Sequence, residues 1–311
     1  MPQSYTDYKR TTENLCATRF LCGLIAEYNS CSTRVRRNMQ CTKICGRSQN
    51  NSLNYLRVNF RLYIEQNFFL MPEPWRIGKV IKIENATEAT RRFWIQIPDV
   101  EKFNFKPGQF VTLDLPIDEK LPKRMRSYSI ASAPDGTNVI ELVIVLLEGG
   151  KGTHYLFNEV KEGSELILRG PQGVFTLPPV IDKDLFFICT GTGIAPFRSM
   201  AEYIHAHNVA HKNIYLIFGC RKCGDALYAE EMTELANTLE NFYYLPTFSR
   251  EAPLEGRRTG YVHGVYEELI NRHKKPAGFF LCGWKNMIDD AKKKIVELGY
   301  DRKDIHQELY G

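Results

Sequence analysis

The feature that most constrains the fold is an alternation of apolar runs with amphipathic stretches after residue 184. The apolar runs cover residues 185–189, 214–218, 242–247 and 279–282. The stretches with helical spacing cover residues 197–207, 229–239, 265–272 and 287–298. Strands that are apolar on both faces and alternate with helices indicate a parallel sheet covered on both sides. Ligands of such sheets bind at the carboxyl ends of the strands, so we expect a ligand site there.

The chain before this point has a different pattern, with short strands separated by turn signals. Strands are expected at residues 93–97, 109–115, 139–147 and 165–168. Turn signals such as Lys106-Pro107-Gly108 and Pro134-Asp135-Gly136 separate them. This spacing predicts an antiparallel barrel or sandwich, and we expect the form of an antiparallel Greek-key β-barrel. A length of 311 residues fits two domains. We expect the barrel over 71–179, a parallel-sheet α/β nucleotide-binding domain over 180–311, and a linker at Pro178-Pro179.

Residues 1–70 differ from the rest in charge and show no sustained periodicity. They hold 10 Lys and Arg against 4 Asp and Glu, whereas residues 71–311 hold 31 against 32. We interpret residues 1–70 as a leader without a fold of its own, with Met71 as the natural start. An organelle presequence and a metal or iron–sulfur module are the alternatives. The nearly neutral remainder gives no reason to expect a nucleic-acid partner.

The nine cysteines form an odd total, which favours reduced thiols and an intracellular, cytoplasmic protein. No apolar run approaches the roughly 20 residues that span a bilayer, so we expect a soluble protein. We also expect a monomer. The pair Cys220 and Cys223 has C-x-x-C spacing, but it lies in an expected ligand loop and we interpret it as incidental. The histidines have no partners at metal-ligand spacing, so no metal is predicted.

The segment Gly191-Thr192-Gly193 follows an apolar run directly and opens a helical stretch. This is the context that a glycine-rich nucleotide loop requires, because glycines let a pyrophosphate approach the backbone. Pro196 suits the first turn of a helix, where its missing amide costs nothing. From Gly191 to Phe197 the sequence reads G-T-G-I-A-P-F. The segment Arg126-Ser127-Tyr128-Ser129 precedes it in the chain, and Cys282-Gly283, Met287 and the terminal Glu308-Leu309-Tyr310 follow it. In order and spacing these motifs resemble the ferredoxin–NADP reductase family, over residues 75–311.

The resemblance implies a flavin site in the barrel. Arg126 would neutralise the flavin pyrophosphate, Tyr128 would lie against the ring system, and Ser129 would hydrogen-bond the reactive flavin nitrogen. Ser127 belongs to the same R-x-Y-S motif. A short helix expected over 154–159 could hold a phosphate through the amides of Gly150, Lys151 and Gly152 and through Thr153 as its N-cap. The barrel and the terminal aromatic favour FAD over FMN.

The resemblance also implies a nicotinamide site, with NADP preferred to NAD. The residues expected to bind NADP(H) are Thr190, Gly191, Thr192, Gly193, Pro196, Arg221, Ser249, Arg250, Cys282, Gly283 and Met287. Of these, Arg221 and Arg250 would hold the 2′-phosphate. Ser129, Cys282, Glu308 and Tyr310 are the expected catalytic residues, because the family places its cysteine beside the nicotinamide and its terminal carboxylate and aromatic beside the flavin.

The function implied is an NAD(P)H-dependent flavoprotein reductase that exchanges electrons between NADP(H) and a one-electron carrier such as ferredoxin or flavodoxin through FAD. One alternative is the reductase component of an oxygenase or a free flavin reductase. Another, of a different class, is an electron-transfer subunit that binds FAD and no nicotinamide. The intact G-T-G-I-A-P segment argues against that last alternative.

Overall fold

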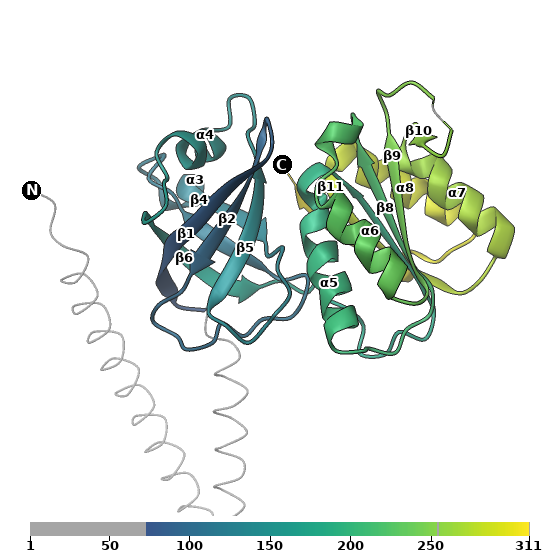
Figure 1. The fold of residues 1–311 in the computed structure, drawn as a ribbon, viewed down its shortest axis with the longest axis horizontal. Helices are drawn as coiled ribbons and strands as arrows, with labels where there is room; N and C mark the ends of the chain where they lie inside the picture. The colour runs from purple at the N-terminus through teal and green to yellow at the C-terminus, as the bar shows by residue number, and fades with distance from the viewer. Residues whose placement is uncertain (1–72, 254, 311) are drawn as a thin grey trace, which may run out of the picture. The chain divides into compact units, whose positions relative to one another are not determined.

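A computed structural model describes residues 73–253 and 255–310, and the expected leader at 1–70 lies outside these ranges. The described residues form a six-stranded antiparallel sheet followed by a six-stranded parallel sheet with helices on both faces (Figure 1). This confirms the predicted fold class. Between the two sheets, residues 173–183, with Pro178 and Pro179, form no helix or strand.

The antiparallel sheet has the strand order β4-β3-β6-β1-β2-β5. Its elements are β1 (Trp75–Thr87), β2 (Thr90–Gln96), β3 (Phe110–Asp114), α3 (Leu121–Arg124), β4 (Met125–Ser129), β5 (Val139–Val145), α4 (Lys151–Asn158) and β6 (Glu165–Gln172). A bridge between Ile130, after β4, and Leu142, in β5, joins the two edges of the sheet and gives it a barrel-like form. We call this half of the described chain the barrel.

Strand β5 shows how the sequence places side chains on two sides. Successive side chains of a strand point to opposite faces. Ile140, Leu142 and Ile144 belong to the core of the barrel. Val143 packs instead with the core of the second half, and Glu141 is also buried. Strand β5 is therefore shared between the barrel core and the contact with the parallel sheet.

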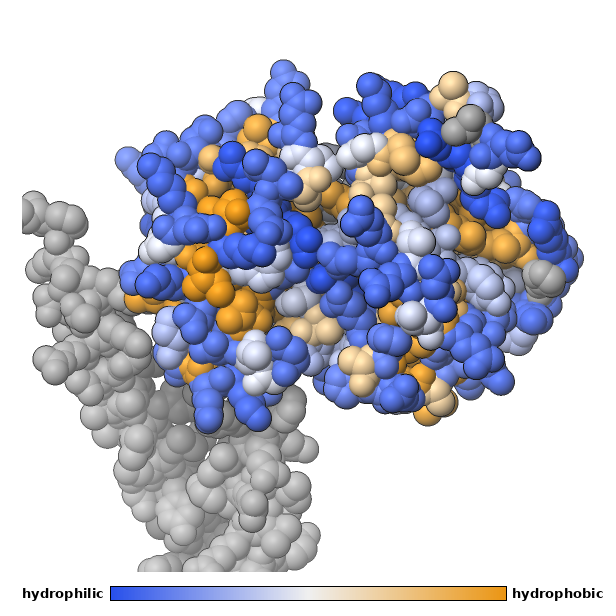
Figure 2. Space-filling model, viewed as in Figure 1, coloured by the Kyte–Doolittle hydropathy of each residue, from blue (hydrophilic) through white to orange (hydrophobic). Residues whose placement is uncertain are grey.

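Strand β1 is the one long element that the pattern does not predict. It runs for 13 residues, but only Gly78 and Val80 are buried, so it lacks the apolar alternation by which a strand is detected. Ile77 and Ile81 are more than 40% exposed, and Figure 2 shows hydrophobic surface over this part of the barrel.

The parallel sheet has the strand order β10-β9-β8-β7-β11-β12. Its strands are β7 (Asp184–Thr190), β8 (Ile214–Cys220), β9 (Phe242–Phe248), β10 (Arg258–Thr259), β11 (Ala277–Trp284) and β12 (Ile305–Tyr310). The longer helices are α5 (Ala195–Ala206), α6 (Ala229–Thr238), α7 (Val262–His273) and α8 (Lys285–Glu297), and the short ones are η1 (Gly191–Ile194), η2 (Cys223–Asp225) and η3 (Arg302–Asp304). We call this half the α/β half.

Helices α5 and α6 cover one face of the parallel sheet and α7 and α8 the other, each pair with its own apolar cluster (Figure 1). The chain runs outward from β7 to β10 and then returns to β11 on the other side of β7. The order therefore reverses between β7 and β11, and open α/β sheets bind ligands outside the strand ends at such a point.

Three of the four longer helices of the α/β half begin earlier than predicted, whereas α6 begins at Ala229 as predicted. Helix α5 starts at Ala195 after η1, α7 at Val262 and α8 at Lys285, two or three residues before the predicted starts. In α7, His263 and Gly264 separate Val262 from the next apolar residue, and α8 begins with the polar Lys285 and Asn286, so the apolar pattern becomes regular only after each helix has begun. No helix in the ranges that the structure describes is both long and apolar enough to cross a membrane.

Candidate active site

Two adjoining cavities lie where β7 and β11 end. The first has a volume of about 680 Å³ and is walled by β4, by the start of α4 and by the ends of β11 and β12. The second has a volume of about 880 Å³ and is walled by the loop after β7, the ends of β8 and β9 and the start of α8. Five residues line both cavities, namely Val145, Leu147, Thr190, Thr192 and Trp284. Molecules bound in the two cavities would therefore meet at these residues.

The first cavity collects most of the residues expected to bind flavin. All four residues of the R-x-Y-S motif line it, from Arg126 to Ser129. Arg126 donates to the backbone oxygens of Lys123 and Met125, at 3.0 and 2.7 Å. Within the described residues it makes no salt bridge, so its charge is available to an anionic ligand. Burial raises the pKa of Tyr128 to about 12, which keeps its phenol neutral.

The prediction that Thr153 is the N-cap of the short helix is wrong. Helix α4 begins at Lys151, and Gly150 is its N-cap. The Thr153 hydroxyl donates to the Gly150 carbonyl at 3.0 Å and accepts from the Leu147 amide at 3.1 Å, so it braces the turn from inside the helix. Gly150, Gly152 and Thr153 line the cavity, whereas Lys151 is exposed and does not. An anion here would meet the first-turn amides of α4, which have no partner within the helix.

A carboxylate and a hydroxyl that are 179 residues apart in the chain meet in the first cavity. Ser129 donates a hydrogen bond from Oγ to Oε1 of Glu308. Strand β12 pairs in parallel with β11, which sets Glu308 beside Cys282 and Tyr310 beside Trp284. Burial raises the pKa of Glu308 above its ordinary value, and the hydrogen bond from Ser129 opposes this. The pair can hold a proton next to any ring bound in the cavity.

Tyr310 lines the first cavity and is partly exposed, and its hydroxyl is buried beside Ser129 and the Cys282 thiol. Cys282 lies behind the cavity wall, fully buried, and lines neither cavity. Burial raises the pKa of the Cys282 thiol well above its ordinary value, so it is a neutral packing group here.

The glycine-rich loop lines the second cavity. Gly191 and Thr192 line the cavity, and Gly191 has a φ of 55°, in the left-handed region that favours glycine. Gly193 faces the other way: a Cβ on it would lie 2.4 Å from the carbonyl oxygen of Cys282. This glycine lets the loop pack against β11. Pro196 is buried in the first turn of α5, away from both cavities.

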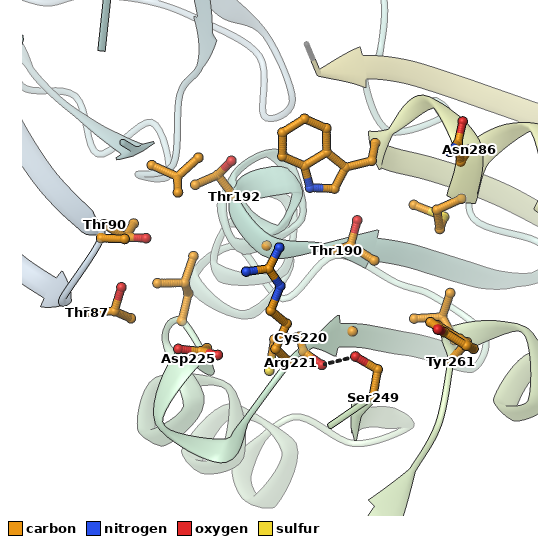
Figure 3. A pocket seen from close by; sticks show the side chains of 18 of the residues that line it. Thr87, Thr90, Thr190, Thr192, Cys220, Arg221, Asp225, Ser249, Tyr261 and Asn286 are labelled. Atoms are coloured by element: carbon orange, nitrogen blue, oxygen red, sulfur yellow. Dashed lines mark hydrogen bonds between the residues drawn. The ribbon is translucent and has the colours of Figure 1, made fainter. Parts of the chain in front are cut away.

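Arg221 and Arg250 occupy different positions around the second cavity. Arg221 points into it, near Asp225 and facing Thr190 and Thr192 (Figure 3). Ser249 also lines it, and its hydroxyl donates to the Cys220 carbonyl at 3.4 Å. Arg250 is exposed and lines neither cavity; its backbone amide donates to the Arg221 carbonyl at 2.9 Å. Gly283 lines the first cavity and Met287 the second.

Several cavity residues carry no signal that sequence reasoning used. Trp284 lines both cavities and is 49% exposed, although it directly follows the recognised Cys282-Gly283 pair. Tyr261 and His263 come from the start of α7, which the periodicity placed too late. Burial lowers the pKa of His263, so it favours the neutral ring.

The residues present fit two anionic ligands with flat rings. The Thr190 hydroxyl is buried at the wall shared by both cavities and has no hydrogen-bond partner among the described residues. Such orphaned groups are costly unless a ligand satisfies them. One arginine without a carboxylate partner among the described residues lies in each cavity, Arg126 in the first and Arg221 in the second. No group of three or more metal-ligating side chains occurs in the ranges 73–253 and 255–310.

Two family models match the chain along its two halves. An oxidoreductase FAD-binding domain matches residues 78–177, and an oxidoreductase NAD-binding domain matches residues 187–293. The FAD-binding match covers the first cavity's R-x-Y-S motif, and the NAD-binding match covers the glycine-rich loop. The two matches confirm that the chain has an FAD-binding and a nicotinamide-nucleotide-binding domain.

Proteins similar to this chain in sequence or structure are named as reductases. Ferredoxin–NADP reductase B of Sorangium cellulosum is 34% identical, with 78% of this chain and 99% of the relative covered. The reductase subunit of glycine betaine monooxygenase from Pseudomonas aeruginosa is 31% identical, covering 78% and 68%. A crystal structure of a ferredoxin NADP⁺ reductase from Neisseria gonorrhoeae with bound FAD and NADP is 25% identical, with a TM-score of 0.64 and coverage of 76% and 98%. The chain therefore belongs to the ferredoxin–NADP reductase family and is an NAD(P)H-dependent flavoprotein oxidoreductase.

Proposed function

We propose that the protein exchanges electrons between NADP(H) and a one-electron carrier protein, such as ferredoxin or flavodoxin, through FAD. The observation that carries this proposal is the meeting of the two cavities at five shared residues beside Ser129, Glu308 and Tyr310. When bound, FAD supplies the chemistry of accepting a hydride and giving electrons up singly. The name and nearly complete coverage of the Sorangium relative support the carrier assignment.

The chain's own residues would bind and orient the two ligands. Arg126 and the first-turn amides of α4 would hold the flavin phosphates, and the loop at Gly191 and Thr192 would hold the nucleotide pyrophosphate. Ser129 would hydrogen-bond the flavin edge, with Glu308 keeping a proton within reach of that hydroxyl. Tyr310 would cover the ring and exclude water until nicotinamide replaces it. Hydride transfer needs little more than this stacked, near-attack geometry.

We assign the nucleotide as NADP(H), with Arg221 as the principal residue for the 2′-phosphate and Ser249 beside it. Arg221 reaches into the second cavity without a carboxylate partner among the described residues, and a guanidinium matches phosphate geometry. Arg250 lies outside the cavity wall and reaches a phosphate only by moving its side chain inward.

Arg221→Ala should raise the KM for NADPH about 10–100-fold and that for NADH little, since a charged hydrogen bond is worth roughly 1.5–3 kcal/mol. Arg250→Ala should have a smaller effect in the same direction. Equal effects of Arg221→Ala on both nucleotides would remove this arginine from the phosphate site.

A reductase component of an oxygenase system is the second candidate. It is favoured by the names of relatives such as the glycine betaine monooxygenase reductase subunit and the electron transfer component of anthranilate 1,2-dioxygenase from Acinetobacter baylyi. Both candidates share the chemistry at the flavin and differ only in the acceptor.

An anaerobic titration with NADPH and then NADH, followed at the flavin absorbance band, tests the first half of the proposal. Bleaching by NADPH at much lower concentration is the expected result, and a yellow protein that neither nucleotide bleaches would refute it. The reduced protein is then mixed with ferredoxin, with flavodoxin and with free FMN. Fast reoxidation by a carrier protein supports the proposal, whereas reoxidation by free FMN alone would indicate a free flavin reductase.

A further inference from the structure

A cluster of charged and aromatic side chains joins the barrel to the α/β half and lines neither of the two large cavities. Its members from the barrel are Arg92 in β2 and Glu141 in β5; those from the α/β half are Arg198 and Glu202 in α5, Tyr228 before α6, and Glu231 in α6. The family's motifs include only Arg198 among them, as the residue that follows G-T-G-I-A-P-F.

Glu141 is the centre of this cluster. Its side chain is only 3% exposed. From within the barrel, Arg92 donates to it at 2.6 Å; from the α/β half, Tyr228 donates its hydroxyl at 2.7 Å and Arg198 its guanidinium at 3.3 Å. A buried carboxylate needs all its partners, because an unpaired charge away from water is costly. The carboxylate thus ties the two halves together at one point.

The other contacts of the cluster also restrain the position of the barrel relative to the α/β half. Arg198 also donates to the Ala131 carbonyl at 2.9 Å, a second link across the two halves. The guanidiniums of Arg92 and Arg198 lie over the Tyr228 ring, at 4.7 and 4.6 Å from its centre. Tyr228 has a φ of 55°, a conformation that a bulky residue rarely adopts unless its surroundings hold it there.

Helix α5 and strand β5, which contain Arg198 and Glu141, are directly connected to residues that line the two cavities. Helix α5 follows the nucleotide loop directly, so Arg198 is five residues beyond Gly193 and roughly 8 Å away along the axis. Strand β5 holds Glu141 and, four residues on and roughly 13 Å away, Val145, which lines both cavities. A tilt of about 5–10° at the cluster would move these walls by roughly 1–2 Å relative to each other. Displacements of about 1 Å can slow a positioned reaction on the order of 100-fold.

We infer that Glu141 is a positioning residue for hydride transfer: through Arg198 and Tyr228 it fixes the distance between the nicotinamide and flavin cavities. The inference rests on NAD(P)H-dependent flavin reduction and is independent of which carrier protein accepts the electrons.

The test uses the FAD-loaded full chain and its Glu141→Gln variant, which keeps the side-chain shape and loses the charge. We expect the rate of flavin bleaching at saturating NADPH to fall about 10–100-fold. FAD should stay bound, and the Kd for NADP⁺ should change less than about threefold, because most of the nucleotide wall belongs to the α/β half. The matched control is Asp304→Asn, which breaks the 2.6 Å ion pair with Lys183 inside the α/β half and should leave the bleaching rate within about twofold.

A second readout does not depend on activity. Calorimetry of the flavin-free protein should show a lower unfolding temperature for Glu141→Gln than for the wild type or Asp304→Asn, because the buried charge between the halves is lost while the Arg198–Ala131 hydrogen bond and the packing of Val143 remain. If Glu141→Gln does not fold, Tyr228→Phe removes only the hydroxyl that crosses between the halves, and it should lower the bleaching rate by about 3–10-fold.

Three results would overturn the inference: an unchanged bleaching rate in the folded variant, a fall matched by an equal rise in the Kd for NADP⁺, or an equal fall in Asp304→Asn. An unfolding temperature of Glu141→Gln equal to that of the wild type would do the same. If NADPH fails to bleach even the wild type, flavin reduction itself is refuted, while calorimetry still decides whether Glu141 joins the two halves.

Discussion

Replacing Gly193 with alanine tests whether the nucleotide loop depends on close contact with β11. A Cβ at this position would lie 2.4 Å from the carbonyl oxygen of Cys282, 2.7 Å from its carbonyl carbon and 3.0 Å from the amide nitrogen of Gly283. Ordinary contacts of this kind begin at 3.4 Å. All three atoms belong to the backbone of a central strand, so no side chain can move aside, and the loop must retreat by about 1 Å.

The magnitude follows from this displacement. Overpacking of a well-packed interior typically costs about 1–3 kcal/mol, which corresponds to a fall of about 2–12 °C in the melting temperature of a chain of this size. The displaced loop should also bind the nucleotide pyrophosphate less well. We expect the Kd for NADP⁺ to rise about tenfold, equivalent to about 1.4 kcal/mol, while FAD remains bound.

Thermal denaturation and an NADP⁺ titration of the FAD-loaded variant measure both effects. Gly264→Ala in α7 is the matched control, because a Cβ there meets nothing within 4 Å and its φ is not in the left-handed region. It should be neutral or stabilising by up to about 1 kcal/mol, as expected for glycine to alanine within a helix. If Gly193→Ala melts and binds NADP⁺ like the wild type, the loop is not held by its contact with β11.

Three further predictions concern the first cavity. Burial raises the pKa of Glu308 in the folded protein above about 4.5, the ordinary value that holds in the unfolded chain. Between these two pKa values the folded carboxyl keeps a proton that the unfolded carboxyl has lost, so the stability of the flavin-free protein falls as pH rises through this range. Melting curves should therefore show Glu308→Gln gaining more over the wild type at about pH 7 than at about pH 4, and an equal gain at both would contradict the burial argument. Ser129→Ala should slow flavin bleaching by NADPH about 10–100-fold with NADP⁺ affinity unchanged, since one positioned hydrogen bond is lost; stopped-flow measurement of a wild-type rate would exclude a role at the flavin edge. Arg126→Ala should weaken FAD binding about 10–100-fold by equilibrium titration, whereas the exposed Lys151→Ala should not, and similar losses in both would mean that general positive charge is what counts.

The change in apolar period near residue 184 was enough to predict two halves with different sheets, because burial on both faces and burial on one face leave different patterns. The motifs were enough to predict Ser129 and Glu308 as site residues, and the structure places them in contact although they are 179 residues apart. Their roles remain predictions, as do the limits of the two domains.

Other features could not be read from the sequence. Strand β1 was missed because most of its side chains face water. Thr153 was taken for a cap because the pattern did not show that the turn at Gly149 and Gly150 already starts the helix. Arg92 and Glu141 look like the polar residues of an ordinary strand. Only the packing of one sheet against the other shows that their partners lie in α5 and before α6.

The link through Glu141 also bears on how such proteins can be recombined. A hybrid of the barrel from one reductase and the α/β half from another would bury a charge without its partner unless Arg92 and Glu141 were matched by Arg198, Tyr228 and Glu231. A barrel and an α/β half are therefore compatible only if these five residues match. They are the positions to exchange together when a hybrid reductase is made to combine a new electron acceptor with an existing nucleotide specificity.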